Sequence, residues 1–477
     1  MKRLSLTRTE LWSFAALAAA SLLILACAPA QYFGRQQDDL LYFISAHALS
    51  EGHYRLFTSP LMVPLVMITP GFPLLLLPLA WLAPGGHALA QAFCALLTAA
   101  LPWALYFFLK KRLEPLVALL IALLVASSPI VLSQAGTVMS ETAYLLSTLA
   151  LLAALEKRGA KAELGAGGWL LAASQIRPAG ISLLPALLAG RGRAPAPLAR
   201  LLGPAALGAA LWSLWSWSVS GQVQELEEFR LSYADRPPIR VLSVAWENLV
   251  FYLEAWGGSY LPAGWTGASV WAGLLLAALA ADGCRRALRR DRADRASWLL
   301  IGAAAMHAVW AWQYQRYLIP LLPFLLAAAA ASLGRFTRPA LGALLAAQLL
   351  VHAPRWIGAH GSWATPELER TYAFINGRSR PEDILASALF VRDGYHAGRP
   401  SVPLPDGDDA EDFAAALKRR RVRQVLWQSR LELGLTAQRS SPLQERLDRS
   451  ERFLENRALF KLIHEDREEG SRVYWLR

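Results

Sequence analysis

The chain has 477 residues, of which 55% are hydrophobic, and it carries a formal net charge of +12. Its apolar residues stand in long blocks, which excludes an ordinary soluble protein and predicts a multi-pass membrane protein. Lys and Arg fall mainly in short loops between the blocks, so membrane topology explains the positive charge and nucleic acid is not expected as a partner. The basic surplus of the C-terminal part could instead meet the headgroups of membrane lipids.

The first apolar block, Leu11 to Ala30, is long enough to cross a bilayer. It follows Met-Lys-Arg like a signal peptide, but its length and the spans that follow favour a signal anchor. The basic residues before it place the N-terminus in the cytoplasm, so the chain emerges on the other side. Leu74 to Leu82 is too short to span and is expected at the interface, which makes residues 31–87 an external loop.

A span over Ala88 to Leu109 returns the chain to the cytoplasm. Leu164 to Gly190 then lies between two basic loops and is interrupted by Arg177-Pro178, which predicts two short helices that meet near the external side. Residues 220–264 are expected to form a long external loop. The other spans are predicted at Leu116–Ser133, Thr142–Leu155, Leu201–Val219, Trp265–Ala281, Trp298–Trp312, Leu318–Leu333 and Leu341–Val351.

This reading gives a helical membrane domain over residues 1–355 with about eleven crossings, so the C-terminus is expected outside the cell or in the periplasm. Residues 361–477 have a soluble composition and predict a small external α/β domain. In it, Thr365 with Pro366 and Asp408 are expected to begin helices, the second with Phe413 and Leu417 on one face. Strands are predicted at Asp383–Phe390, Gln424–Gln428, Phe460–Ile463 and Val473–Leu476.

Two adjacent acids, Asp38 and Asp39, follow the first span. Ionised carboxylates are costly in hydrocarbon, so the pair is expected in an aqueous pocket at the interface. In a helix over residues 38–50, Asp38 and Tyr42 share one face. Acids at a helix start are often only caps, but one suffices for that role. The second favours a general base that takes a proton from an acceptor, or an acid that orients it.

Other polar residues stand at the predicted ends of spans. Ser140-Glu141 opens one span, where the Glu either caps the helix or holds an acceptor or a metal. Arg316-Tyr317 opens another, where the pair either anchors the interface or presents a guanidinium to a lipid-linked phosphate. Arg177 would face the same side. Paired acids and paired arginines suggest group transfer from a lipid phosphate.

The cysteines Cys27, Cys94 and Cys284 show neither a disulfide framework nor zinc-site spacing. No His-Glu-x-x-His sequence, phosphate-binding loop or Gly-x-Ser-x-Gly elbow is present. The sequence thus assigns no cofactor and no metal ligands.

The order of these motifs resembles the C-type (GT-C) superfamily of membrane glycosyltransferases, in particular the branch with protein O-mannosyltransferases and the lipid A aminoarabinose transferase. Asp38-Asp39-Leu-Leu-Tyr42 looks like the Asp-Glu-x-x-Tyr of that branch, although Asp39 is shorter than the usual Glu. Thr69 to Pro73 looks like its Pro-Pro-Gly-Tyr-Pro, with Thr in place of the first Pro. The matches over Leu11 to about Val351 continue at Ala46–Tyr54, Ser140-Glu141, Arg177-Pro178 and Arg316–Pro320.

The resemblance implies an inverting glycosyltransferase at the external face of the inner membrane, with a polyprenyl-phosphate sugar as donor and a protein, glycan or lipid as acceptor. Asp38 would be the catalytic base with Asp39 beside it. The donor phosphate would bind Arg316, Arg177 and Tyr317, and the other substrate contacts would be Tyr42, His53, Tyr54 and Glu141. Some relatives bind a divalent metal near this site and others need none.

Two other readings stay open. A transporter or flippase of lipid-linked sugars would also use external arginines and a broken helix pair, but it would favour charged groups near mid-membrane and matching halves. A scaffold that binds partners through its external domain would tolerate the loss of Asp38.

Overall fold

A computed structural model of the chain describes residues 7–28, 33–34, 37–83, 86–157, 159–189, 195–221, 239–310, 313–358, 368–429 and 442–477. The chain forms two compact units. The first, called the helical unit, comprises Met1–Ala30, Thr69–Leu75 and Ala88–Gly361. The second, called the mixed unit, comprises Gln31–Ile68, Leu76–His87 and Ser362–Arg477. Most of the predicted external loop over residues 31–87 therefore groups with the C-terminal residues.

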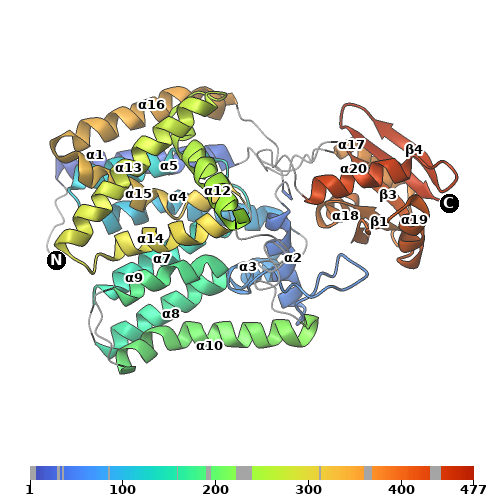
Figure 1. The fold of residues 1–477 in the computed structure, drawn as a ribbon, viewed down its shortest axis with the longest axis horizontal. Coiled ribbons are helices and arrows are strands. Elements are labelled where there is room, and N and C mark those ends of the chain that lie inside the picture. The colour runs from blue at the N-terminus through green and yellow to red at the C-terminus, as the bar shows by residue number, and fades with distance from the viewer. Residues whose placement is uncertain are drawn as a thin grey trace. The chain divides into compact units, whose positions relative to one another are not determined.

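The helical unit follows the predicted succession of apolar blocks (Figure 1). Its helices are α1 (Arg8–Cys27), α4 (His87–Leu109), α5 (Pro115–Ala126), α6 (Pro129–Leu132), α7 (Glu141–Leu155), α8 (Ala160–Ile176), η2 (Pro178–Leu183), α9 (Leu184–Leu188), α10 (Pro195–Ser220), α12 (Ile239–Gly257), η3 (Gly258–Tyr260), α13 (Thr266–Arg290), α14 (Arg295–Val309), η4 (Gln315–Leu318), α15 (Leu322–Leu333), η5 (Gly334–Phe336) and α16 (Thr337–Gly358).

Four helices of the described residues are long and apolar enough to cross a membrane, namely α1, α4, α10 and α13. Shorter apolar helices include α5, α7 and the η2–α9 pair. The chain is thus a largely helical membrane protein with a small C-terminal sheet. The number of about eleven crossings and the orientation of the termini stay predictions.

The break predicted at Arg177-Pro178 is present, because α8 ends at Ile176 and Arg177 has an extended backbone (φ −147°, ψ 134°) before η2. The single span predicted over Leu116–Ser133 is wrong in its second half. There the chain leaves α5, turns through Ser127 and Ser128, and begins α6 at Pro129. A proline disfavours helical conformation in the residue before it, and Ser128 is extended accordingly.

The stretch predicted as a loop over residues 220–264 contains the 19-residue helix α12. Its buried residues include Val244, Asn248 and Ala255, whose spacings of four and seven positions place them on one face of the helix. This face packs against α13 and α14. The helix α13 also continues beyond the predicted span end at Ala281 into the basic segment, up to Arg290.

The mixed unit is built on a five-stranded sheet of order β2-β1-β3-β5-β4 (Figure 1). The parallel strands are β1 (Ile384–Ser387), β2 (Ser401–Pro403) and β3 (Val422–Gln428), and β5 (Ser471–Leu476) runs antiparallel to both β3 and β4 (Phe460–Asp466). The helices of the unit are α2 (Asp38–Ser50), the second half of α3 (Gly71–Leu82), α17 (Glu369–Arg378), α18 (Phe390–Ala397), α19 (Ala410–Arg419) and α20 (Pro442–Leu454).

The four predicted strands of the α/β domain correspond to β1, β3, β4 and β5. The predicted apolar face of α19 is buried, with Phe413 1% and Leu417 0% exposed. The predicted cap is off by one residue, because Asp409, not Asp408, accepts the backbone N–H of Asp412. The predicted cap at Thr365 lies outside the described residues, and β2, α18 and α20 were not predicted.

Candidate functional site

Three of the predicted site residues meet inside the helical unit. The Glu141 carboxylate at the start of α7 lies 2.6 Å from Nη1 of Arg177 and 3.1 Å from Nε of Arg316. Glu141 and Arg316 are buried, with side-chain exposures of 1% and 6%, and Arg177 is 14% exposed. We call this group the arginine cluster. Its members are far apart in the sequence and are brought together by the packing of α7, the η2 turn and η4.

The Arg177 turn is held by close backbone packing. A Cβ added at Gly71 would lie 2.6 Å from the Ile176 nitrogen, and one at Gly180 would lie 2.6 Å from the Ser174 Cα, so neither position has room for a side chain. The Tyr144 hydroxyl donates to the Ala179 carbonyl at 3.2 Å. Gly71 therefore allows α3 to begin directly against the backbone that carries Arg177.

Arg316 is positioned by a turn that follows α14, and the residues that hold this turn were not predicted. The buried Asn248 of α12 donates from Nδ2 to the carbonyls of His307 and Trp310, both at 2.8 Å, and of Ala308 at 3.1 Å. Gln313 donates in turn to the Asn248 side-chain oxygen at 2.9 Å. These bonds satisfy carbonyls at the end of α14, which a helix cannot pair by itself. They fix the start of the segment that leads to Arg316.

Aromatic rings support both guanidinium groups. The Arg316 guanidinium lies 4.0 Å from the centroid of the Tyr314 ring, and the Arg177 guanidinium lies 5.1 Å from that of Tyr317. The Tyr317 ring is also in edge contact with the imidazole of His307, at a centroid distance of 5.8 Å. Cation–π contacts of this kind hold planar guanidinium groups in a set orientation. Tyr317, predicted as a phosphate-site residue, therefore lies against Arg177.

Guanidinium groups outnumber carboxylates within the arginine cluster itself. Glu141 neutralises one of two guanidinium charges, so the three groups together carry a formal charge of +1. In a buried setting such a charge acts through a low effective dielectric and attracts an anion more strongly than at a water-exposed surface. The same geometry disfavours the metal-binding alternative for Glu141, because a cation at its carboxylate would face two guanidinium groups.

The acids lie in the mixed unit, at the start of α2. Asp39 is fully buried, and its Oδ2 accepts the backbone N–H of Gly34 at 2.8 Å. Its Oδ1 accepts the backbone N–H of Leu40 at 2.9 Å. Asp38 is half-buried in the first turn of the same helix. Asp39 therefore fixes the approach to the helix, and Asp38 is the more accessible acid of the two.

The peptide group between Phe33 and Gly34 links Asp39 to the C-terminal residues. Its N–H is the donor to Asp39, and its carbonyl oxygen lies 2.8 Å from Nε2 of His396 in α18. A carbonyl can only accept, so Nε2 of His396 carries the proton. One peptide group is thus held on its two sides by the acid helix and by the α/β domain.

Aromatic packing reinforces this link. The Phe33 ring stacks on the imidazole of His87 at a centroid distance of 4.5 Å and makes edge contacts with Phe43 and Tyr395. The Tyr395 hydroxyl is hydrogen-bonded to Nδ1 of His87 at 3.1 Å. Burial lowers the pKa of His396 to about 4 and raises the pKa of Tyr395 to about 12. His396 is therefore neutral at pH 7, with its proton on Nε2.

The other residues predicted for the acceptor have their own contacts in the mixed unit. Tyr42 is half-buried on α2, one turn after Asp38. Nε2 of His53 is 3.0 Å from a carboxylate oxygen of Glu51. The buried Tyr54 donates its hydroxyl to the Ile68 carbonyl at 2.8 Å, and burial raises its pKa. Tyr42 thus shares the helix with the acids, whereas Tyr54 secures the loop that follows.

No group of three or more His, Cys, Asp or Glu that could hold a metal is found among the described residues. Two supporting residues were not predicted: Asn248, which holds the turn before Arg316, and His396, which holds the Phe33 carbonyl. A helical period of buried residues on α12 could have revealed Asn248. His396 had no local signal, because its partner Phe33 is 363 residues away.

No protein-family model and no curated protein matches this chain by sequence. Solved structures do match. ArnT from Cupriavidus metallidurans bound to undecaprenyl phosphate aligns with a TM-score of 0.59 and 11% identity, over 97% of this chain and 97% of ArnT. The chain has the GT-C fold.

Archaeal oligosaccharyltransferase structures give the same result. The Archaeoglobus fulgidus oligosaccharyltransferase tethered with an acceptor peptide aligns with a TM-score of 0.53 and 12% identity, over 87% of this chain and 69% of that one. AglB from the same organism, in complex with an inhibitory peptide and a dolichol-phosphate, aligns with a TM-score of 0.50 and 13% identity over 88% and 69%. These neighbours are GT-C glycosyltransferases. At such identities the likeness establishes the fold.

Proposed function

We propose that the chain is an inverting glycosyltransferase that moves a sugar from a polyprenyl-phosphate donor to an acceptor at the extracytoplasmic face of the inner membrane. The observation that carries the proposal is the arginine cluster, in which the buried Arg316 and the partly buried Arg177 face one carboxylate. A lipid-linked phosphate is an anion that must be held at membrane depth, and guanidinium groups offer it planar pairs of donors.

The bond changes follow from the groups present. An acceptor hydroxyl or amine attacks the anomeric carbon, and the bond from that carbon to the phosphate oxygen breaks with its electron pair on the phosphate. Asp38 takes the proton of the acceptor. Arg177 and Arg316 stabilise the charge that develops on the departing lipid phosphate, so that oxygen needs no separate acid. A single displacement inverts the anomeric centre.

Asp39 is given a positioning role in this proposal. Both of its oxygens accept backbone N–H groups, and its side chain is fully buried. The α/β domain has a related task, because His396 holds the peptide group that Asp39 also binds. The fold neighbours support the proposed donor class, since one was solved with undecaprenyl phosphate and another with dolichol-phosphate. A protein, glycan or lipid acceptor fits the proposal equally.

The test is sugar transfer by purified protein in liposomes, with a panel of radiolabelled polyprenyl-phosphate sugars and an envelope extract as acceptor. Wild type is expected to release lipid phosphate with one donor, and Asp38→Asn is expected to release none above background. Asp408→Asn, which changes an exposed acid of the α/β domain, is the matched control and should keep full activity. Movement of a lipid-linked sugar between leaflets without any transfer would replace the proposal with the flippase alternative.

A further inference from the structure

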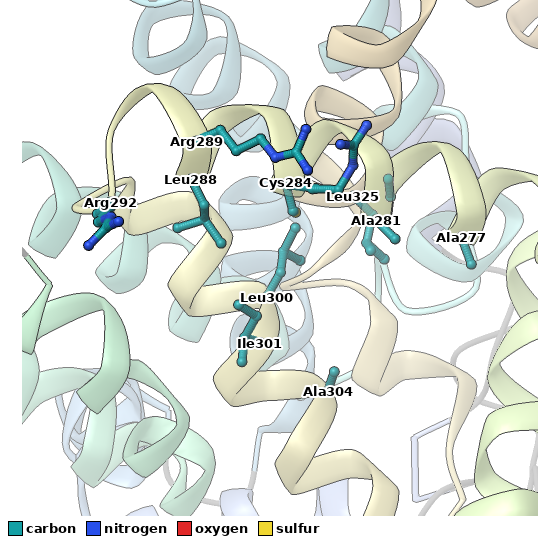
Figure 2. Close-up of a pocket in the computed structure, with 12 residues that line it drawn as sticks. Ala277, Ala281, Cys284, Leu288, Arg289, Arg292, Leu300, Ile301, Ala304 and Leu325 are labelled. Atoms are coloured by element: carbon teal, nitrogen blue, oxygen red, sulfur yellow. The ribbon is translucent and has the colours of Figure 1, made fainter.

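An apolar groove lies in the helical unit, between α13, α14 and α15. It has a volume of about 720 Å³. Figure 2 shows Leu300, Ile301 and Ala304 in succession along α14, with Cys284 and Arg289 on α13. Small side chains, among them Ala277, leave room along the wall. The groove has the apolar lining that a hydrocarbon chain needs.

Arginines line one part of this groove. Arg285, Arg289 and Arg292 belong to the lining. Arg285 is ion-paired with Asp282, but Arg289 and Arg292 have no ion pair with any carboxylate in the described part of the chain. Asp291 and Asp294 are nearby and accept backbone N–H groups, but residues 282–295 hold six arginines against three acids. The rim of the groove is therefore cationic.

The basic end of the groove is separate from the arginine cluster. Its basic rim lies at the start of α14, next to Arg295. The ring of His307, near the other end of α14, contacts Tyr317 beside the cluster. A helix rises about 1.5 Å per residue, so the 15 residues of α14 place the two regions about 20 Å apart along its axis. One polyprenyl phosphate group cannot occupy both.

We propose that this groove binds an anionic bilayer phospholipid, with one acyl chain along α14 and the headgroup phosphate between Arg289 and Arg292. The helix α13 is among those long and apolar enough to cross a membrane, so lipid covers its exposed face. An apolar groove that ends in cations without ion-pair partners complements a phospholipid whose headgroup is negative. A zwitterionic lipid fills the same wall but leaves the positive charge of the rim uncompensated.

Native mass spectrometry of the full chain tests this. Delipidated protein in detergent is mixed with phosphatidylglycerol or phosphatidylcholine of the same acyl composition. Wild type is expected to retain phosphatidylglycerol preferentially, and Arg289→Ala with Arg292→Ala is expected to reduce that retention about thirtyfold, as two basic residues near an anionic headgroup contribute. Ala281→Trp fills the groove with the arginines intact and should reduce it as well.

The matched control is Arg286→Ala with Arg290→Ala, which removes the same charge from α13 at residues outside the groove lining. It should keep the preference for phosphatidylglycerol. Equal losses in the two double variants, or equal retention of both lipids by wild type, would overturn the proposal in favour of general surface attraction. Competition by a polyprenyl phosphate at equimolar concentration would overturn it in favour of a second substrate site. If Ala281→Trp does not fold, the two arginine pairs decide alone.

Discussion

The arginine cluster and the acid helix hold charged side chains in opposite ways. Glu141, Arg177 and Arg316 neutralise one another through side chains from three separate elements. Asp39 instead receives two backbone N–H groups from its own neighbourhood. In the arginine cluster two guanidinium groups share one carboxylate, whereas Asp39 accepts two backbone N–H groups that fix the loop before its helix. The arginine cluster is therefore suited to binding, whereas Asp39 is suited to orienting the helix that carries Asp38.

The largest effect is expected at Asp38. Asp38→Asn should lower transfer about a thousandfold, since a general base contributes 10² to 10⁴ in rate. Asp39→Asn keeps an acceptor oxygen for the Gly34 N–H and should cost much less. Initial rates of sugar transfer at saturating donor measure the difference. Equal losses in the two variants would remove the distinction between base and positioning residue.

The next largest effect is expected in the arginine cluster. Arg316→Lys keeps the charge but loses the planar donor pair and the stacking on Tyr314, so transfer should fall about a hundredfold. Most of the loss should appear as weaker donor binding. The KM for the lipid-linked donor measures it. An unchanged KM with a normal rate would show that the cluster is only an internal ion pair.

A smaller effect is expected from the glycine that supports Arg177. Gly71→Ala places a Cβ 2.6 Å from the Ile176 nitrogen, so the backbone must shift, which costs about 1–3 kcal/mol of stability. Thermal unfolding in detergent and the donor KM should both change. Gly168→Ala in α8 is the control, because no atom lies within 4 Å of its added Cβ. Similar behaviour of the two variants would contradict the close packing described for the turn.

Substitutions of Asn248 test how the turn before Arg316 is held. Asn248→Ala leaves the carbonyls of His307 and Trp310 without their side-chain donor, which should cost about 1–3 kcal/mol in the free energy of unfolding. Asn248→Asp should cost more, because a carboxylate cannot donate and repels carbonyl oxygens. Chemical denaturation of the purified variants gives the order. The reverse order would contradict the assigned hydrogen bonds.

The smallest effect is a pH dependence of the acid helix. The pKa of His396 is about 4 in the folded chain and 6.5 in a model peptide, so the unfolded state binds the proton first as the pH falls. The stabilisation from neutral His396 is complete above pH 6.5 and is lost towards pH 4, by at most about 3 kcal/mol. The protection factors of residues 37–50 against amide hydrogen exchange, which are corrected for the intrinsic pH dependence of exchange, should fall in that window. His396→Gln, which can still donate to Phe33, should show a weaker pH dependence.

The residues of the arginine cluster could be predicted from the sequence, but their contacts with one another could not. Span ends and the Arg177-Pro178 break could be predicted because proline and basic residues act locally. That Glu141 would lie between two arginines depends on the packing of distant helices, which no local pattern contains. The helix α12 was not predicted, because its polar residues obscure the helical spacing of its buried residues. The role of Asn248 was therefore not predicted either.

In the mixed unit, prediction from the sequence fails for a different reason. Its strands and the apolar face of α19 follow short periods in the sequence, so they could be predicted. The assignment of Asp38 and Asp39 to different roles could not, because adjacent identical acids differ only in what the fold places beside them. The contact of Phe33 with His396 joins the acid helix to a domain predicted as separate, across most of the chain.

Donor binding and proton removal are assigned to different parts of the chain. Equilibrium binding and single-turnover transfer of one lipid-linked sugar by Asp38→Asn and Arg316→Ala separate the two functions. We expect Asp38→Asn to bind the donor as wild type does but to transfer no sugar, and Arg316→Ala to lose donor affinity. Normal transfer by Asp38→Asn, or normal donor affinity in Arg316→Ala, would contradict this assignment.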